Sequence, residues 1–146
     1  MSAYAERQHL PYAAPQLFDL VADVERYPEF MPWVIEARIR RRKDRTIVVG
    51  MTVGVGPLRK RFLTIAALDR PHRIDIRSGD STFDHFQQNW TFEPAAEGGT
   101  NVEYRVDFQF RSRVLQTLMG AAFSDQANAT MSAFKRRAHR LYGGPS

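Results

Sequence analysis

The chain has 146 residues, with 21 Lys and Arg against 16 Asp and Glu, so its formal net charge is +5. This length fits a single domain, residues 1–146, with enough residues for a hydrophobic core. The absence of cysteine excludes disulfides, thiol nucleophiles and thiolate metal sites. The modest positive charge admits an anionic partner, such as membrane lipid or RNA, without choosing between them.

Two segments bear on location. Residues 1–7 lack the basic-then-apolar order of a signal peptide. The longest nearly apolar stretch, residues 46–58, contains three glycines and is shorter than the roughly 20 residues that cross a bilayer. We therefore expect a cytoplasmic protein, and a peripheral position at the inner membrane stays open.

The first predicted helix begins near Pro15, since proline is tolerated in the first helical turn. Apolar residues then recur at helical spacing: Leu17, Phe18, Val21, Ala22 and Val24. Pro28 and Pro32 end this pattern and predict a tight turn or short helical piece over residues 27–31. Residues 4–10, before the helix, are short enough for an edge strand.

From Trp33 to Phe110 the apolar pattern changes to period two, which indicates strands with one buried face. The expected strands cover residues 33–40, 47–55, 58–68, 73–78, 86–92 and 102–110. Turn-forming residues separate them, as in Gly56-Pro57 and Glu97-Gly98-Gly99. This order predicts an antiparallel meander with one dry and one wet face.

The last segment, residues 113–142, has no proline and predicts one long helix. Its apolar stripe consists of Leu115, Leu118, Met119, Ala122, Phe123, Ala127, Met131, Phe134, Ala138 and Leu141. A helix of this length reaches about 45 Å and can cross a whole sheet. We therefore predict an α+β helix-grip fold, in which a curved antiparallel sheet of about seven strands surrounds the C-terminal helix.

The concave side of this sheet is expected to be apolar and aromatic. Its predicted members are Trp33, Ile35, Met51, Phe62, Phe86, Trp90, Tyr104 and Phe108, with Met119, Phe123 and Phe134 from the helix. Gln88 falls on the same face, and a buried amide needs a hydrogen-bond partner. The pattern is compatible with a filled core or with a cavity whose ligand meets Gln88.

The segment Tyr-Pro-Glu-Phe-Met-Pro-Trp at residues 27–33 carries a family resemblance, supported by Phe83…Trp90-Thr91-Phe92 and Ala133-Phe134…Arg137-Ala138. Over residues 4–143 the chain resembles the coenzyme Q-binding branch of the START-like, polyketide-cyclase-type superfamily. In many bacteria that branch is also known as the ribosome association toxin family. The chain departs from the pattern at Val34, where the family often has cysteine, and at Ser81-Thr82 and Lys135-Arg136.

The resemblance implies a helix-grip fold that binds a polyprenyl quinone (ubiquinone) or another lipid in a tunnel between sheet and helix. The chain would then act as a quinone chaperone that supports respiratory electron transport, with no cofactor beyond the bound lipid. The expected ligand-binding residues are Phe30, Met31, Trp33, Phe62, Phe86, Gln88, Trp90, Tyr104, Phe108, Met119 and Phe123. Phe30, Met31 and Trp33 would lie near the entrance.

Little in the sequence supports catalysis. The histidines His9, His72, His85 and His139 lie far apart, without the spacing of metal ligands. No phosphate-binding glycine loop and no nucleophile elbow is present. Although some members of the superfamily are cyclases, we expect a protein that is not an enzyme and holds no metal.

The positive charge is concentrated in residues 38–45, 59–61 and 135–140. Such clusters can be a solvated surface, a contact with anionic membrane lipid or a contact with RNA. The expected contact residues are Arg40, Arg41, Arg42, Lys135 and Arg136. The absence of aromatic residues within 38–45 favours lipid over RNA, and DNA is not expected. The alternative function is a ribosome-binding regulator that blocks subunit association.

Overall fold

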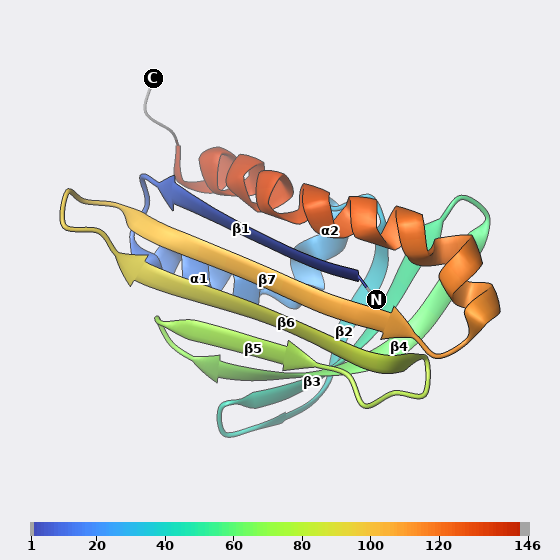
Figure 1. Ribbon diagram of the computed structural model, residues 1–146. Coiled ribbons are helices and arrows are strands. Elements are labelled where there is room, and N and C mark those ends of the chain that lie inside the picture. The colour runs from blue at the N-terminus through green and yellow to red at the C-terminus, as the bar shows by residue number, and fades with distance from the viewer. Residues whose placement is uncertain (1, 144–146) are drawn as a thin grey trace.

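The structure is a computed structural model that describes residues 2–143. Seven strands form one curved antiparallel sheet, and the long helix α2 lies along its concave side (Figure 1). The strands are β1 (Ser2–Leu10), β2 (Val34–Lys43), β3 (Thr46–Val55), β4 (Leu58–Asp69), β5 (Arg73–Arg77), β6 (Phe83–Pro94) and β7 (Thr100–Phe110). The helices are α1 (Ala14–Ala22), the 3₁₀ helix η1 (Val24–Glu29) and α2 (Arg113–Tyr142). The spatial order is β1-β7-β6-β5-β4-β3-β2, which confirms the predicted helix-grip fold.

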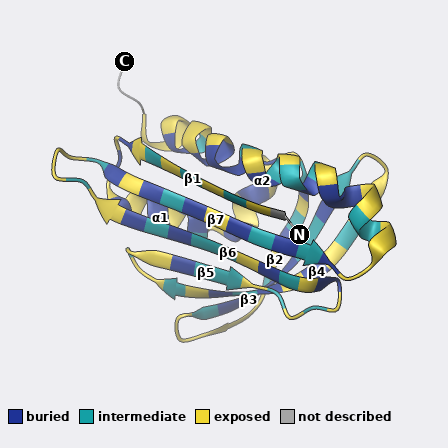
Figure 2. Cartoon of the chain, in the orientation of Figure 1, coloured by how far each residue is buried: buried dark blue, intermediate teal, exposed yellow. Residues whose placement is uncertain are grey.

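Burial along the strands follows the predicted alternation most clearly in β7 (Figure 2). There Tyr104, Val106 and Phe108 point into the core, and Arg105 and Asp107 between them are less buried. Because neighbouring side chains on a strand point to opposite faces, one face of β6 and β7 supplies most of the aromatic core beneath α2. Within residues 2–143, no helix is both long and apolar enough to cross a membrane.

Helix α2 has the predicted bounds. Its N-terminus is capped by the Ser112 side chain, which accepts a hydrogen bond from the backbone N–H of Leu115 at 3.2 Å. The buried stripe is narrower than predicted, since Leu118 and Leu141 are 56% and 50% exposed. Leu118 lies about 100° around the helix from the buried Met119, and Leu141 lies in the last turn. Their assignment to the stripe was therefore wrong.

The short helices cover the remainder of the concave side. Phe18 of α1 packs edge to face against Phe92 of β6, with ring centroids 5.8 Å apart. The short helical piece predicted over residues 27–31 begins earlier, at Val24, and ends at Glu29 with Pro28 inside it. A 3₁₀ helix accepts this proline within so short a run because each turn has few internal hydrogen bonds to lose.

A bulge in β2 corrects one predicted core residue. The pairing of β2 with β3 shifts between Val34 and Glu36, so the strict alternation that would bury Ile35 is interrupted. Val34 and Ala37 are 4% exposed, whereas Ile35 is 37% exposed. Ile35 therefore lies on the convex face, next to Gly54, and does not belong to the concave core.

Candidate functional site

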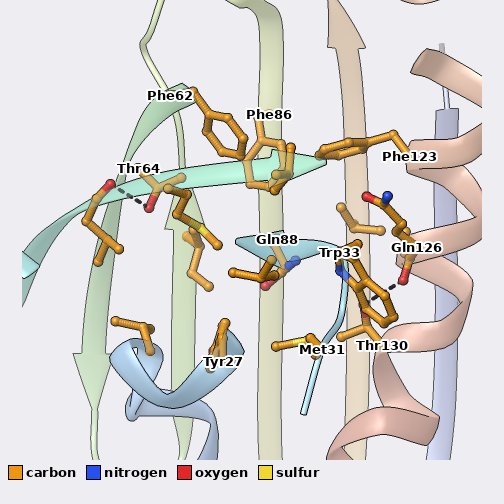
Figure 3. A pocket seen from close by; sticks show the side chains of 18 of the residues that line it. Tyr27, Met31, Trp33, Phe62, Thr64, Phe86, Gln88, Phe123, Gln126 and Thr130 are labelled. Atoms are coloured by element: carbon orange, nitrogen blue, oxygen red, sulfur yellow. Dashed lines mark hydrogen bonds between the residues drawn. The ribbon is translucent and has the colours of Figure 1, made fainter. Parts of the chain in front are cut away.

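A cavity of about 90 Å³ lies between the concave sheet face and α2; we call it the sheet–helix cavity. Its apolar and tyrosine lining consists of Val24, Tyr27, Met31, Trp33, Val34, Val49, Met51, Val53, Phe62, Ala66, Ile76, Phe86, Tyr104, Val106, Phe123, Ala127 and Phe134. The other lining residues are Thr64, Gln88, Gln126 and Thr130 (Figure 3). The lining thus contains two side-chain amides and two threonine hydroxyls, and among residues 2–143 it includes no charged side chain.

Gln88 is held by hydrogen bonds on both sides of its amide. Its Oε1 accepts from the indole N–H of Trp90 at 3.1 Å, and its Nε2 donates to the Tyr104 hydroxyl at 3.5 Å. Burial raises the pKa of Tyr104, and hydrogen bonds with Thr130 and Gln88 act in the opposite direction. The phenol therefore keeps its proton at neutral pH.

Gln126 joins α2 to the opposite strand. Its Nε2 donates to the backbone carbonyl of Gly54 at 3.0 Å, and the Gly54 N–H donates to the carbonyl of Trp33 at 2.9 Å. These two bonds connect α2, β3 and the loop before β2 at the cavity. The other amide atom, Oε1, is buried and has no hydrogen-bond partner among residues 2–143.

The cavity contains many of the predicted ligand-binding residues: Met31, Trp33, Phe62, Phe86, Gln88, Tyr104 and Phe123. Trp90, Phe108 and Met119 are not among the lining residues, which differs from their predicted direct contact with the ligand, and Phe30, expected near the entrance, is not among them either.

Three of these residues, Trp90, Phe108 and Met119, lie behind the lining, whereas the half-buried Phe30 packs against Phe134 beside the cavity. Trp90 is 1% exposed and packs on Tyr104 with ring centroids 4.6 Å apart. Phe108 packs behind Phe123, also at 4.6 Å, and Met119 is 1% exposed one turn before Phe123. A period-two or helical pattern identifies the inward face, but it does not tell which inward side chains reach the innermost layer.

The sequence patterns missed Gln126, Thr130 and Thr64. All three are polar residues on otherwise apolar faces, and the search for apolar stripes passed over them. Gln126 lies three residues after Phe123, and Thr130 lies four residues before Phe134, so helical spacing places both on the face toward the sheet. A polar residue inside an apolar stripe is the signal that could have identified them.

The Tyr-Pro-Glu-Phe segment docks onto the end of α2. The rings of Tyr27 and Phe30 each lie 5.3 Å from that of Phe134. Arg137 is 12% exposed; its guanidinium lies 5.1 Å above the Phe30 ring and donates to Glu29 at 2.9 Å. The segment therefore attaches η1 to α2 beside the cavity.

Glu29 makes the stability of this contact pH-dependent. Hydrogen bonds from Arg26 and Arg137 hold the pKa of the Glu29 carboxyl below its usual value of 4.5. A lowered pKa in the folded state stabilises the fold above the usual value, and this stabilisation is lost as the pH falls. In urea unfolding at pH 7, the wild type is therefore expected to have a higher free energy of unfolding than Glu29→Gln. This difference should shrink below about pH 4.5.

The control is Glu93→Gln. Glu93 is an exposed glutamate of β6 that has no ion pair among the described residues. Its replacement removes the same charge as Glu29→Gln without breaking an ion pair. A difference between wild type and Glu29→Gln that stays constant from pH 7 to pH 3 would contradict the role of the Glu29 ion pairs.

The predicted basic contact residues divide between the two sides of the sheet. Arg41 pairs with Val48 and lies on the convex face, whereas Arg42 pairs with the buried Ile47 and points to the other side. Lys135 and Arg136 are exposed on α2, which covers the concave side. The predicted group therefore does not form one surface.

A different arginine set does share a face. Arg59 and Arg61 of β4 pair with Gly54 and Thr52 on the convex side, as Arg41 does with Val48, and the Arg40 side chain lies over Gly50. We call Arg40, Arg41, Arg59 and Arg61 the convex arginine patch. Within residues 2–143, no carboxylate lies within 4.0 Å of these guanidinium groups.

Gly50 leaves room for the Arg40 side chain. A Cβ at position 50 would lie 2.9 Å from the Arg40 Nε, so any larger residue there would displace this side chain.

Comparison with known proteins places the chain in a family. A sequence profile described as "Polyketide cyclase / dehydrase and lipid transport" matches residues 10–135. Ribosome association toxin RatA of Pseudomonas aeruginosa is 32% identical, over 98% of this chain and 100% of its own length. Coenzyme Q-binding protein COQ10 homolog B, mitochondrial, of Xenopus laevis is 26% identical, over 96% of this chain and 59% of its own length.

Solved structures of other proteins superpose on this chain over almost its whole length. An 18 kDa protein of Caulobacter crescentus superposes with a TM-score of 0.76 and 31% identity, covering 99% of this chain and 100% of that one. The Zhui aromatase/cyclase of a Streptomyces species superposes with a TM-score of 0.79 over 99% of both chains, and at 18% identity it shows the fold alone. The resemblance inferred from residues 27–33 is thereby confirmed, and the chain belongs to the polyketide cyclase / dehydrase and lipid transport family.

Proposed function

We propose that the chain binds the ring of a quinone, or of a similar lipid, in the sheet–helix cavity and acts as a carrier. The observation that carries this proposal is an apolar cavity whose lining includes the side-chain amides of Gln88 and Gln126. A quinone ring is apolar on both faces and carries oxygen atoms at its edge, so its chemistry matches such a lining. The Xenopus laevis relative is named as a coenzyme Q-binding protein, which supports a quinone as the ligand.

The size of the cavity limits what enters. At about 90 Å³ it is smaller than the ~150 Å³ cavity that accepts benzene in another protein, so ring entry requires side chains to move. Met51 is half-buried and has a flexible side chain, and Trp33 is half-buried. These two side chains can therefore move to admit the ring. A polyprenyl tail is far longer than this cavity, so it stays outside, in a bilayer or in solvent.

We further propose binding without catalysis and without a cofactor. The cavity lining contains no carboxylate, histidine, lysine or arginine among residues 2–143. Burial raises the pKa of Tyr27 and of Tyr104, so neither phenol is poised to take a proton at neutral pH. A quinone incubated with the protein should be recovered chemically unchanged.

The test uses the two tryptophans of the chain, since Trp33 lines the cavity and Trp90 donates to Gln88. Titration with a ubiquinone that carries one isoprenoid unit should quench their fluorescence to a plateau. The exposed variant Leu118→Ala should give the same curve. Quenching that never saturates, together with no quinone in lipid extracts of protein purified from its own host, would overturn the proposal.

A second candidate function is ribosome association. Among residues 2–143, no guanidinium group of the convex arginine patch has a carboxylate within 4.0 Å, and the Pseudomonas aeruginosa relative is named for ribosome association. Arginine groups without acidic partners suit the phosphates of RNA, and such binding weakens as salt rises. This function would use the convex face and leave the cavity free.

The double variant Arg59→Glu/Arg61→Glu is expected to abolish cosedimentation with the large ribosomal subunit at low salt. The matched control is Lys135→Glu/Arg136→Glu, which makes the same charge change on α2. Its cosedimentation should stay near that of the wild type. Equal loss in both variants would show a dependence on net charge alone, and no loss in either would exclude the convex patch as the contact.

A further inference from the structure

The Oε1 atom of Gln126 is a buried acceptor without a partner, and the surrounding bonds fix its position. The neighbouring Nε2 donates to the Gly54 carbonyl at 3.0 Å. A carbonyl oxygen can only accept, so the amide cannot be flipped without losing this bond. In Figure 3 the Gln126 amide points toward the cavity, where it is among the lining groups.

The other amide is also fixed. The indole N–H of Trp90 can only donate, and it lies 3.1 Å from the Gln88 Oε1. The Gln88 Nε2 therefore faces Tyr104, and Thr130 donates to the Gln126 backbone carbonyl at 2.9 Å. Each of these acceptors has a donor from the protein. Gln126 Oε1 also lines the cavity, but no hydrogen-bond donor within residues 2–143 reaches it.

We propose that the cavity selects a ring that carries a hydroxyl group, a phenol or a hydroquinone, over the corresponding quinone. The ring hydroxyl donates its hydrogen to Gln126 Oε1, and a ring oxygen can accept from the free N–H of Gln88. This inference rests on the proposed function, because it requires the ring to enter the sheet–helix cavity.

The preference follows from the donors that each ring carries. A quinone has carbonyl oxygens and no hydrogen-bond donor, so it leaves Gln126 Oε1 buried and unpaired. An unpaired buried acceptor weakens binding by roughly tenfold or more compared with a paired one.

The experiment compares methylhydroquinone with methyl-1,4-benzoquinone by calorimetric titration under nitrogen. The absence of cysteine excludes quinone addition to thiols. The two probes differ in hydration, so the measured quantity is the ratio of their dissociation constants in each variant. We expect the preference for the hydroquinone to be about tenfold greater in the wild type than in Gln126→Met.

Gln109→Met is the matched control. Gln109 also has a buried, unpartnered Oε1, but it lies outside the cavity lining, so its replacement should preserve the preference. Gln126→Leu serves as a second variant if Gln126→Met fails to fold. An unchanged preference in the Gln126 variants, or a wild type that binds the quinone as tightly as the hydroquinone, would overturn this inference alone. Failure of both rings to bind would overturn the proposed function with it.

Discussion

Replacement of Phe134 by alanine is expected to lower the free energy of unfolding by about 3–5 kcal/mol. Phe134 is 3% exposed, and its ring lies 5.3 Å from Tyr27, 5.3 Å from Phe30 and 5.0 Å from Trp90, between ring centroids. These three neighbours come from η1, the loop after it and β6. Truncation would remove the shared partner that joins them to α2, and neighbours on separate elements cannot collapse fully into the space.

Urea unfolding followed by circular dichroism measures the effect. The control is Leu118→Ala on the same helix, because Leu118 is 56% exposed and its truncation should change stability by no more than about 0.5 kcal/mol. A loss below about 1 kcal/mol in Phe134→Ala would show that the aromatic cluster does not hold α2 on the sheet.

Leucine at position 127 is expected to block ring binding while the fold is kept. Ala127 is 7% exposed and lines the sheet–helix cavity, and Ala127→Leu places three further carbon atoms in a space of about 90 Å³. Burial of apolar carbon contributes about 0.8 kcal/mol per carbon to binding, and a six-carbon ring excluded from the cavity loses this contribution. The affinity should therefore fall by roughly a hundredfold or more.

Tryptophan quenching by the short-chain ubiquinone measures the affinity, and thermal unfolding should show a melting temperature equal to or above that of the wild type, since a cavity is filled. Ala121→Leu is the matched control, because Ala121 is exposed on the same helix. Ligand affinity unchanged by Ala127→Leu would place the binding site outside the cavity.

Phe134→Ala and Ala127→Leu separate the effects on stability from those on binding. Phe134→Ala acts on the packing that attaches α2 to the sheet, and Ala127→Leu acts on the space beneath the helix. A variant that loses binding but keeps its melting temperature is therefore informative about the ligand, whereas loss of both reports only on the fold.

The elements themselves were predictable from the sequence, because their signals are local. Helix α2 has its expected bounds, residues 113–142, and the alternation over 102–110 reappears in the burial of β7. The segment over residues 27–33 indicated the family, which supplied the helix-grip arrangement. Where a local irregularity interrupts the period, as at the bulge before Glu36, the pattern assigned Ile35 to the wrong face.

The site depended on contacts between distant segments. The pattern placed Trp90 and Phe108 on the inward face, which is where they lie, but other side chains cover them from the cavity. Gln126 reaches Gly54 across 72 residues of sequence, and this bond leaves its Oε1 as a free acceptor. Periodicity records which face a side chain takes on its own helix or strand. Which residues meet across the cavity, and which polar atom stays unpaired there, is set by how the sheet curves around α2.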